Sequence, residues 1–214
     1  MKAVSLWSGG KDSTFACDKA IKEGHQIVSL VNLLHDDGAH SLSHGISKEI
    51  INIQARSVGL SLVQREMAWK AYREQFISLM RNFKKINGIE GIVFGDIYLE
   101  AHKEWIEDVC SEIEVKAIMP LWGINTEKLA GEFIDLGFEA IIVAANNKFM
   151  GPEFLGRKFD HNLIDELIKI GIDPCGEEGE FHTFVYNGPI FNEMFNFSMI
   201  RKRFSDNHWF LDLN

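Results

Sequence analysis

Residues 3–13 read Ala3-Val4-Ser5-Leu6-Trp7-Ser8-Gly9-Gly10-Lys11-Asp12-Ser13. The first five favour a strand, and apolar residues at helical spacing predict a helix over residues 11–23, closed by Gly24. In a parallel α/β sheet, a strand–loop–helix unit of this kind lies where ligands bind, at the carboxyl ends of the strands. The glycines let the backbone approach a phosphate, the helix start supplies free N–H groups, and Ser8, Lys11 and Ser13 add donors. The segment therefore predicts a phosphate-binding loop.

The spacing of this loop identifies its class. It follows neither the GxxxxGK[ST] pattern nor the GxGxxG pattern, but the SGGxDS pattern of PP-loop enzymes, which cleave ATP between its α and β phosphates. We therefore expect ATP to bind at the six loop residues, Ser8, Gly9, Gly10, Lys11, Asp12 and Ser13. Asp12 is expected at the start of the helix or as an outer partner of Mg²⁺. A serine-capped glycine turn without a ligand is the structural alternative.

Strands and helices alternate through the first part of the chain. Further strands are expected at residues 27–34, 62–65, 91–94 and 115–119, and helices at residues 47–58, 69–87 and 98–112. This βαβα order predicts a parallel, doubly wound sheet with helices on both faces, which is the α/β architecture of the HUP-like PP-loop ATPases.

The last third of the chain changes character. Helices at residues 126–136 and 160–170 and a strand at residues 140–145 continue the alternation, but residues 181–191 and 197–213 are aromatic and β-branched without a helical period. These two stretches predict antiparallel strands. We therefore expect a nucleotide-binding domain of residues 1–122 and a smaller α+β domain of residues 123–214 that holds an acceptor substrate.

Polar residues follow the second and the fourth predicted strands. Residues 35–37 and the pair Gly95-Asp96 should face the same crevice as Ser8, because the carboxyl ends of parallel strands meet at one edge of the sheet. Gly95 and Asp96 are therefore expected to bind the nucleotide, with Asp96 also a candidate for Mg²⁺. The alternative for Asp96 is an N-cap of the helix that begins near Tyr98.

Three histidines lie close to these strand ends in the sequence. His40 and His44 flank Ser41-Leu42-Ser43 in a polar loop, where a solvated side chain is the common case, and His44 is the candidate for contact with substrate. His102 has the helical spacing of a packed histidine or one at the rim of a site.

A second informative segment is acidic and rich in glycine. It reads Asp173-Pro174-Cys175-Gly176-Glu177-Glu178-Gly179-Glu180-Phe181-His182-Thr183 and runs into an apolar strand. Closely spaced carboxylates can hold a metal, bind an ammonium ion or accept its proton. Glu177 and Glu180 are therefore the catalytic candidates. Cys175 lacks a recognisable base partner for a nucleophilic role, and a solvated acidic turn is the structural alternative for the segment.

Composition limits the classes of function. The 214 residues are 46% hydrophobic and carry a formal net charge of -9, which disfavours a nucleic-acid substrate. The one basic cluster, residues 201–203, is expected at a solvated strand end. No apolar stretch of about 18 residues or signal peptide is evident, and the 3 cysteines are far apart, so we expect no membrane partner and a cytoplasmic location. A homo-oligomer is compatible with the sequence.

The motifs together resemble the diphthine–ammonia ligase family over residues 2–191. The resemblance rests on SGGKDS at residues 8–13, Gly45-Ile46-Ser47-Lys48-Glu49, Pro120-Leu121-Trp122, and the pattern Gly-Glu-x-Gly-Glu-[Phe/Tyr]-x-Thr at residues 176–183. It implies that ATP adenylates the carboxylate of diphthine on elongation factor two, and that ammonia then displaces AMP to form an amide. The implied acceptor pocket is lined by Gly176, Glu177, Gly179, Glu180 and Thr183 of the late motif, and Glu178, at the variable position of the pattern, is a further candidate for contact with substrate.

Two segments depart from the pattern of the ligases. Residues 95–102 read Gly-Asp-Ile-Tyr-Leu-Glu-Ala-His where the family has Gly-Ala-Ile-x-Ser-x-Tyr-Gln, and residues 40–44 replace a Ser-Tyr-Met-x-His-like stretch. Both should face the acceptor, so the acceptor stays open. A tRNA-modifying PP-loop enzyme is the first alternative, disfavoured by the acidic charge and the lack of paired cysteines. A non-catalytic nucleotide sensor is the second, disfavoured by the acidic segment.

Overall fold

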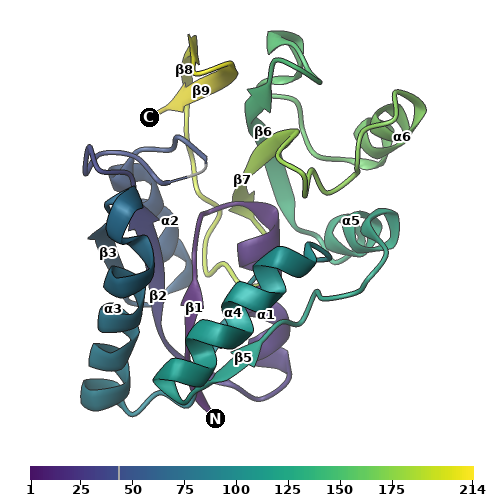
Figure 1. Cartoon of the computed structure of the whole chain (residues 1–214). Helices are drawn as coiled ribbons and strands as arrows, with labels where there is room; N and C mark the ends of the chain where they lie inside the picture. Colours follow the sequence, from purple (N-terminus) through teal and green to yellow (C-terminus); the bar gives the residue numbers. More distant parts are fainter. Residues whose placement is uncertain (43) are drawn as a thin grey trace.

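A five-stranded parallel sheet forms the lower half of the molecule (Figure 1). The computed structural model describes residues 1–42 and 44–214. The strand order is β3-β2-β1-β4-β5, with β1 (Lys2–Leu6), β2 (Gln26–Leu34), β3 (Leu62–Glu66), β4 (Gly91–Val93) and β5 (Lys116–Ile118). The order reverses between β1 and β4, and a ligand crevice is expected at such a switch point. The predicted doubly wound sheet is confirmed.

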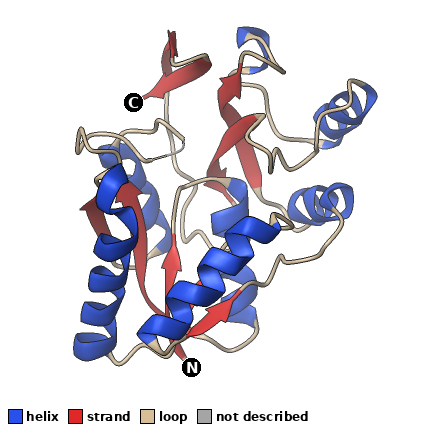
Figure 2. Cartoon of the chain, viewed as in Figure 1, coloured by secondary structure: helices blue, strands red, loops and turns tan. Residues whose placement is uncertain are grey.

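Helices cover both faces of this sheet (Figure 2). The helices α1 (Lys11–Lys22) and α2 (Lys48–Val58) contribute to one apolar cluster, while α3 (Tyr72–Asn87) and α4 (Glu100–Ile113) contribute to the other. Neighbouring residues of β1 pack on opposite faces of the sheet, because successive side chains of a strand point to opposite sides. Ala3 belongs to the first cluster and Val4 to the second. A short 3₁₀ turn, η1 (Trp69–Ala71), precedes α3, so the single helix predicted there is divided.

A smaller antiparallel sheet stands above the carboxyl edge of the first (Figure 1). Its order is β7-β6-β9-β8, with β6 (Glu139–Asn146), β7 (Phe181–Asn187), β8 (Met199–Ser205) and β9 (His208–Leu213). The remaining elements are α5 (Thr126–Asp135), η2 (Pro152–Phe154) and α6 (His161–Lys169). The antiparallel strands expected after residue 180 are thus present. The strand expected at residues 140–145 is also present, but it pairs with β7 and β9 and does not extend the parallel sheet.

One apolar core joins the two halves of the chain. The ring centroid of Phe15 in α1 lies 5.8 Å from that of Phe133 in α5 and 5.6 Å from that of Phe138. Phe159 and Phe181 belong to the same cluster. The cluster fixes β7 and the segment before it against the start of α1. Within the described residues, every helix is too short or too polar to span a bilayer.

Candidate active site

A crevice of 530 Å³ lies at the carboxyl ends of β1, β2 and β4, under the smaller sheet. It is lined by residues from both halves of the chain, including Ser8, Lys11, Asp12, Ser13, Asn32, His44, Tyr72, Gly95, Asp96, His102, Gly176, Glu177, Glu178, Gly179, His182 and Thr183. The predicted phosphate loop and the acidic segment, which are more than 160 residues apart in the sequence, therefore form one site.

The glycines of the loop are required by close packing as well as by conformation. Gly9 has a positive φ of 84°, which glycine adopts without strain. A Cβ at Gly10 would lie 2.4 Å from Nε2 of His44 and 3.0 Å from the carbonyl oxygen of Thr183. At Gly95, a Cβ would lie 2.9 Å from the backbone N of Ser13. Each glycine thus allows another part of the chain to reach the loop backbone.

The hydroxyl groups of the loop bond to one another. Ser8 Oγ lies 3.0 Å from Ser13 Oγ, and the Gly10 N–H donates to Ser8 Oγ at 3.3 Å. Ser13 Oγ also donates to the carbonyl oxygen of Gly10 at 3.1 Å. These donors converge at the start of α1, where the helix dipole favours an anion. Phosphate oxygens can accept hydrogen bonds from these donors in place of the present acceptors.

Lys11 connects the loop to the acidic segment. Its backbone N–H donates to Thr183 Oγ1 at 3.0 Å, and its buried ammonium donates to Asp12 Oδ2 at 2.8 Å and to the carbonyl oxygen of Cys175. Burial by itself would lower the pKa of Lys11, but the neighbouring Asp12 outweighs it, and the pKa lies above its ordinary value. Lys11 therefore keeps its charge within the site. The Val185 N–H completes the connection by donating to the carbonyl oxygen of Gly9 at 3.0 Å.

A buried amide supports the loop from behind, and sequence reasoning missed it. The Nε2 group of Gln54 donates to the carbonyl oxygens of Gly9 at 2.9 Å and Val185 at 2.6 Å. Its Oε1 accepts from the indole N–H of Trp7 at 2.7 Å. Gln54 was expected only as one residue of a helix. A glutamine on the apolar face of α2 was the available signal, because buried polar groups need partners.

The three carboxylates of the acidic segment have different surroundings. Glu177 Oε1 accepts from the Ile97 N–H at 2.8 Å, and burial together with Asp12 and Asp96 raises the pKa of Glu177 to about 7. Glu178 lines the crevice and is exposed. Glu180 is only 7% exposed and does not line the crevice in the described structure, and its Oε2 is buried without a partner there. Glu177 is thus the carboxylate placed to exchange a proton at neutral pH.

Asp96 lines the crevice near Glu177, next to Ile97, whose N–H donates to the Glu177 carboxylate. Helix α4 begins at Glu100 with Leu99 as its N-cap, so the alternative role of Asp96 as a helix cap is wrong. Its Oδ1 lies 3.0 Å from Nδ1 of His102, and burial raises the pKa of Asp96. His102 is at the rim, with 58% of its side chain exposed, in agreement with the expectation.

Two histidine rings lie against each other above the phosphate loop, with an angle of 36° between their planes. The ring centroids of His44 and His182 are 4.5 Å apart, and His44 Nε2 lies 3.3 Å from Ser8 Oγ. The expected solvated loop position is therefore wrong for His44, although it holds for His40, whose exposed ring bonds to Asp37 at 2.8 Å. Sequence reasoning treated His182 as a variable position of the late motif. Its place beside Thr183 at the start of a strand was the available signal.

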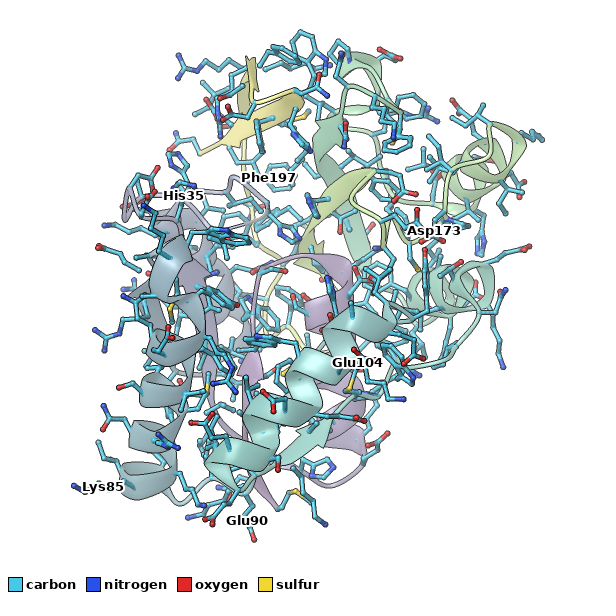
Figure 3. All side chains as sticks on the ribbon, viewed as in Figure 1. His35, Lys85, Glu90, Glu104, Asp173 and Phe197 are labelled. Carbon is cyan, nitrogen blue, oxygen red and sulfur yellow. The ribbon has the colours of Figure 1, made fainter. Side chains whose placement is uncertain are left out.

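Residues 35–37 were expected to face the crevice, and this is wrong for the structure. Figure 3 shows His35 at the outer edge of the loop that follows β2, and 57% of its side chain is exposed. The chain turns back after β2, since Ser41 bridges to Leu34, and brings Ser41, Leu42 and His44 to the crevice instead. Ser43 lies outside the described residues.

Metal binding by protein ligands alone is not supported. Among the residues that the structure describes, there is no group of three His, Cys, Asp or Glu side chains that could hold a metal ion. Cys175 is buried, and burial raises the pKa of its thiol, which argues against a thiolate nucleophile.

Comparison with known proteins gives matches over both halves. The diphthamide synthase N-terminal domain family matches residues 1–117, and the diphthamide synthase C-terminal domain family matches residues 125–214. The diphthine–ammonia ligase of Rattus norvegicus is 29% identical over 217 residues, covering 90% of this chain and 81% of that protein. The diphthine–ammonia ligase of Homo sapiens is 28% identical with the same coverage. A predicted subunit of tRNA methyltransferase from Methanocaldococcus jannaschii is 15% identical, with a TM-score of 0.46 over 91% of this chain and 99% of that one.

Proposed function

The chain belongs to the diphthamide synthase family, as its motifs indicated, and from this premise we propose that it is an ATP-dependent, AMP-forming ligase of the diphthine–ammonia ligase type. ATP adenylates a carboxylate of the acceptor, pyrophosphate leaves, and ammonia displaces AMP to form an amide. The observation that carries the proposal is the single crevice formed by the phosphate loop and the acidic segment, joined through Lys11. A nucleotide sensor would need no second motif there.

The phosphate loop fits the triphosphate of ATP. The hydroxyls of Ser8 and Ser13 and the buried ammonium of Lys11 supply donors and charge, and Gly10 lets His44 approach the loop backbone. Gly95 packs against the start of α1 and, with Asp96, closes the nucleotide side of the crevice. If Mg²⁺ accompanies ATP, Asp12 and the phosphates would hold it, because Mg²⁺ commonly shares its ligands between carboxylates and phosphates.

The acidic segment fits the second half of the reaction. Ammonia must lose a proton as it becomes an amide, and Glu177 titrates near neutral pH beside the loop. Glu178, Gly176, Gly179 and Thr183 form the wall that the acceptor would contact. Glu180 is buried and does not line the crevice in the described structure, so we assign it no direct contact with the acceptor.

The reaction products test this proposal. Purified protein is incubated with ATP, Mg²⁺, ammonium and elongation factor two that carries diphthine. AMP, pyrophosphate and the amidated factor should form in equal amounts, as followed by nucleotide chromatography and mass spectrometry. Omission of ammonium should leave pyrophosphate release without amide. ADP as the main product would contradict the class, whereas AMP formation with a carboxylate other than diphthine would retain the chemistry and change the acceptor.

A further inference from the structure

The paired histidines, His44 and His182, differ from the other parts of the crevice in having no role in the reaction as described so far. His44 Nε2 lies 3.3 Å from Ser8 Oγ, and its Nδ1 is buried without a partner among the described residues. His182 lies 4.5 Å away, ring centroid to ring centroid, and both side chains line the crevice. Gly10 is in direct contact with His44, because a Cβ there would lie 2.4 Å from its Nε2. The pair therefore sits on the phosphate loop itself.

The loop carrying His44 is held in place by the C-terminal hairpin. Arg203 of β8 donates to the carbonyl oxygen of Gly45 at 3.3 Å, and its guanidinium stacks on Phe210 at 4.3 Å. A Cβ at Gly45 would lie 2.6 Å from the Phe210 ring. The packing of β8 and β9 thus positions His44 over the loop.

The charged and titratable groups around the pair come from several elements. Lys11 of α1 lowers the pKa of both histidines by charge repulsion, and His208 of β9 lowers that of His182 in the same way. The carboxylates of Glu177 and Glu178 lie in the acidic wall of the same crevice. Burial, reinforced by Lys11 and His208, lowers the pKa of His182 to about 4, while burial, His182 and Lys11 lower that of His44 well below its ordinary value. Both rings are therefore neutral in the free protein at neutral pH.

We propose that His44 and His182 together take up one proton when the triphosphate of ATP binds, and that the protonated pair then donates to the phosphate oxygens that leave as pyrophosphate. This inference rests on the proposed function, because it assumes that nucleotide occupies the phosphate loop. It assigns the pair to pyrophosphate binding and not to the acceptor.

The hydrogen bonds around Ser8 support a link between phosphate binding and proton uptake by the histidine pair. In the free protein the Ser8 hydroxyl has one proton to share between His44 Nε2 and Ser13 Oγ. Phosphate oxygens only accept. In the tautomer whose proton is on Nδ1, neutral His44 would therefore present the Nε2 lone pair to anionic oxygens once Ser8 donates to phosphate. Protonation turns this acceptor into a charge-assisted donor. A second proton on the histidine pair is disfavoured, since the ring centroids are 4.5 Å apart and Lys11 is already charged.

Calorimetry with a nucleotide that cannot be cleaved tests the proposal. The α,β-methylene analogue of ATP, with Mg²⁺, is titrated into wild-type protein, His44→Gln and His182→Gln at several pH values, in buffers of different ionisation enthalpy. The analogue's own protonation is common to all proteins and cancels in the difference. Wild-type protein should take up close to one more proton than either variant at pH 7. His161→Gln is the control, because His161 is exposed on α6 and bonds to Asp135.

The affinity for the ATP analogue is expected to change with pH in a defined direction. A ligand that raises a histidine pKa binds more tightly as pH falls through the bound-state pKa, and the gain ends near the free-state value, about 4 for His182. We expect either variant to bind the analogue about tenfold more weakly than wild type at pH 6, with the deficit shrinking as pH rises. Folding of each variant is checked by circular dichroism.

Three outcomes overturn the inference, and they are distinguishable. Unchanged affinity in both folded variants shows that the pair does not contact phosphate. Weaker binding with unchanged proton uptake shows that the pair acts without protonation, by packing or as a neutral N–H donor. Failure of folded wild-type protein to bind the analogue at all removes the proposed function and the inference with it. If one variant does not fold, the other still decides between these outcomes.

Discussion

Ionisation of Glu177 is expected to have opposite effects on activity, which it supports, and on folding stability, which it lowers. Its folded pKa of about 7 lies above the ordinary 4.5, so the folded state binds more protons between these values, and stability should fall as pH rises through that window. The same ionisation provides the base for amide formation. Glu177→Gln should therefore lose roughly 10²–10⁴ in amide formation and also lose this pH dependence of unfolding.

Separate half-reactions identify the step in which Glu177 acts. ATP–pyrophosphate exchange should persist in Glu177→Gln, because the carboxylate serves the attack of ammonia after adenylation. Glu104→Gln is the control, since Glu104 lies on the exposed side of α4 (Figure 3). Loss of exchange together with amide formation would place Glu177 at the nucleotide instead.

Gly10 tests the close contact between the loop and the rest of the crevice. In Gly10→Ala the new methyl would meet His44 at 2.4 Å and the Thr183 carbonyl at 3.0 Å, so the loop or the β7 strand must shift. Gly131 is the matched control, because it also lacks a positive φ and a Cβ there meets its first neighbour only at 4.0 Å. In α5, Gly131→Ala should stabilise the protein by about 0.5–1 kcal/mol.

The measurement for this pair is nucleotide affinity beside thermal unfolding. Gly10→Ala should bind the ATP analogue at least tenfold more weakly, by the loss of about one charge-assisted hydrogen bond. Equal affinities in the two variants would show that the contact over Gly10 does not affect the phosphate site.

At the scale of elements, the first half of the chain was predictable from periodicity and end signals. Ser47 caps α2 through its side chain, and Gly59 and Gly88 end α2 and α3 in the left-handed region, so the helix boundaries were marked in the sequence. The pairing partners of β6 were not predictable, because the apolar run at residues 140–145 fits a parallel or an antiparallel neighbour.

The candidate site was predicted in part, and the missing part has a physical reason. Motif spacing located Ser8 to Ser13 and Glu177, but His182 and Gln54 act through contacts that cross more than 40 residues. Such contacts depend on how the smaller sheet packs on α1, which no local pattern specifies. The loop after β2 was misplaced for the same reason, since its position depends on Arg203 and Phe210.

Gln54 makes a prediction about how α2 supports the loop. Gln54→Leu removes three hydrogen bonds and leaves the Trp7 N–H and the carbonyls of Gly9 and Val185 buried without that partner. An unsatisfied buried group costs about 1–3 kcal/mol, so urea unfolding should show a loss of at least this size. Gln26→Leu, at an exposed position of β2, should change stability by less than about 0.5 kcal/mol. A similar small effect of both changes would show that the amide can be replaced by packing alone.

At the scale of the whole molecule, the active site lies between the two sheets, so its geometry depends on how firmly the halves are joined. The two domain families divide the chain between residues 117 and 125, and the sequence predicts a boundary after residue 122. The apolar core does not follow this division, because the cluster around Phe15 includes α1, α2, α5 and the strands β6 and β7. A core shared in this way favours a single cooperative unit, in which opening of the crevice by separation of the halves is rare.

Phe15→Ala tests this cooperativity. Phe15 is 1% exposed and makes edge contacts with Phe133 and Phe138 across the junction. Truncation of a buried phenylalanine costs about 3–5 kcal/mol. If the halves unfold together, native-state hydrogen exchange of the slowest amides in β4 and in β6 should accelerate by the same factor. Phe76→Ala is the matched comparison, since Phe76 is fully buried in the cluster between the sheet and the α3 and α4 helices. A cooperative molecule transmits that loss to β6 as well, because both strands then exchange only through global unfolding. Acceleration confined to β4 in Phe76→Ala would show instead that the nucleotide half unfolds independently, and the crevice would then be a joint between two separately stable bodies.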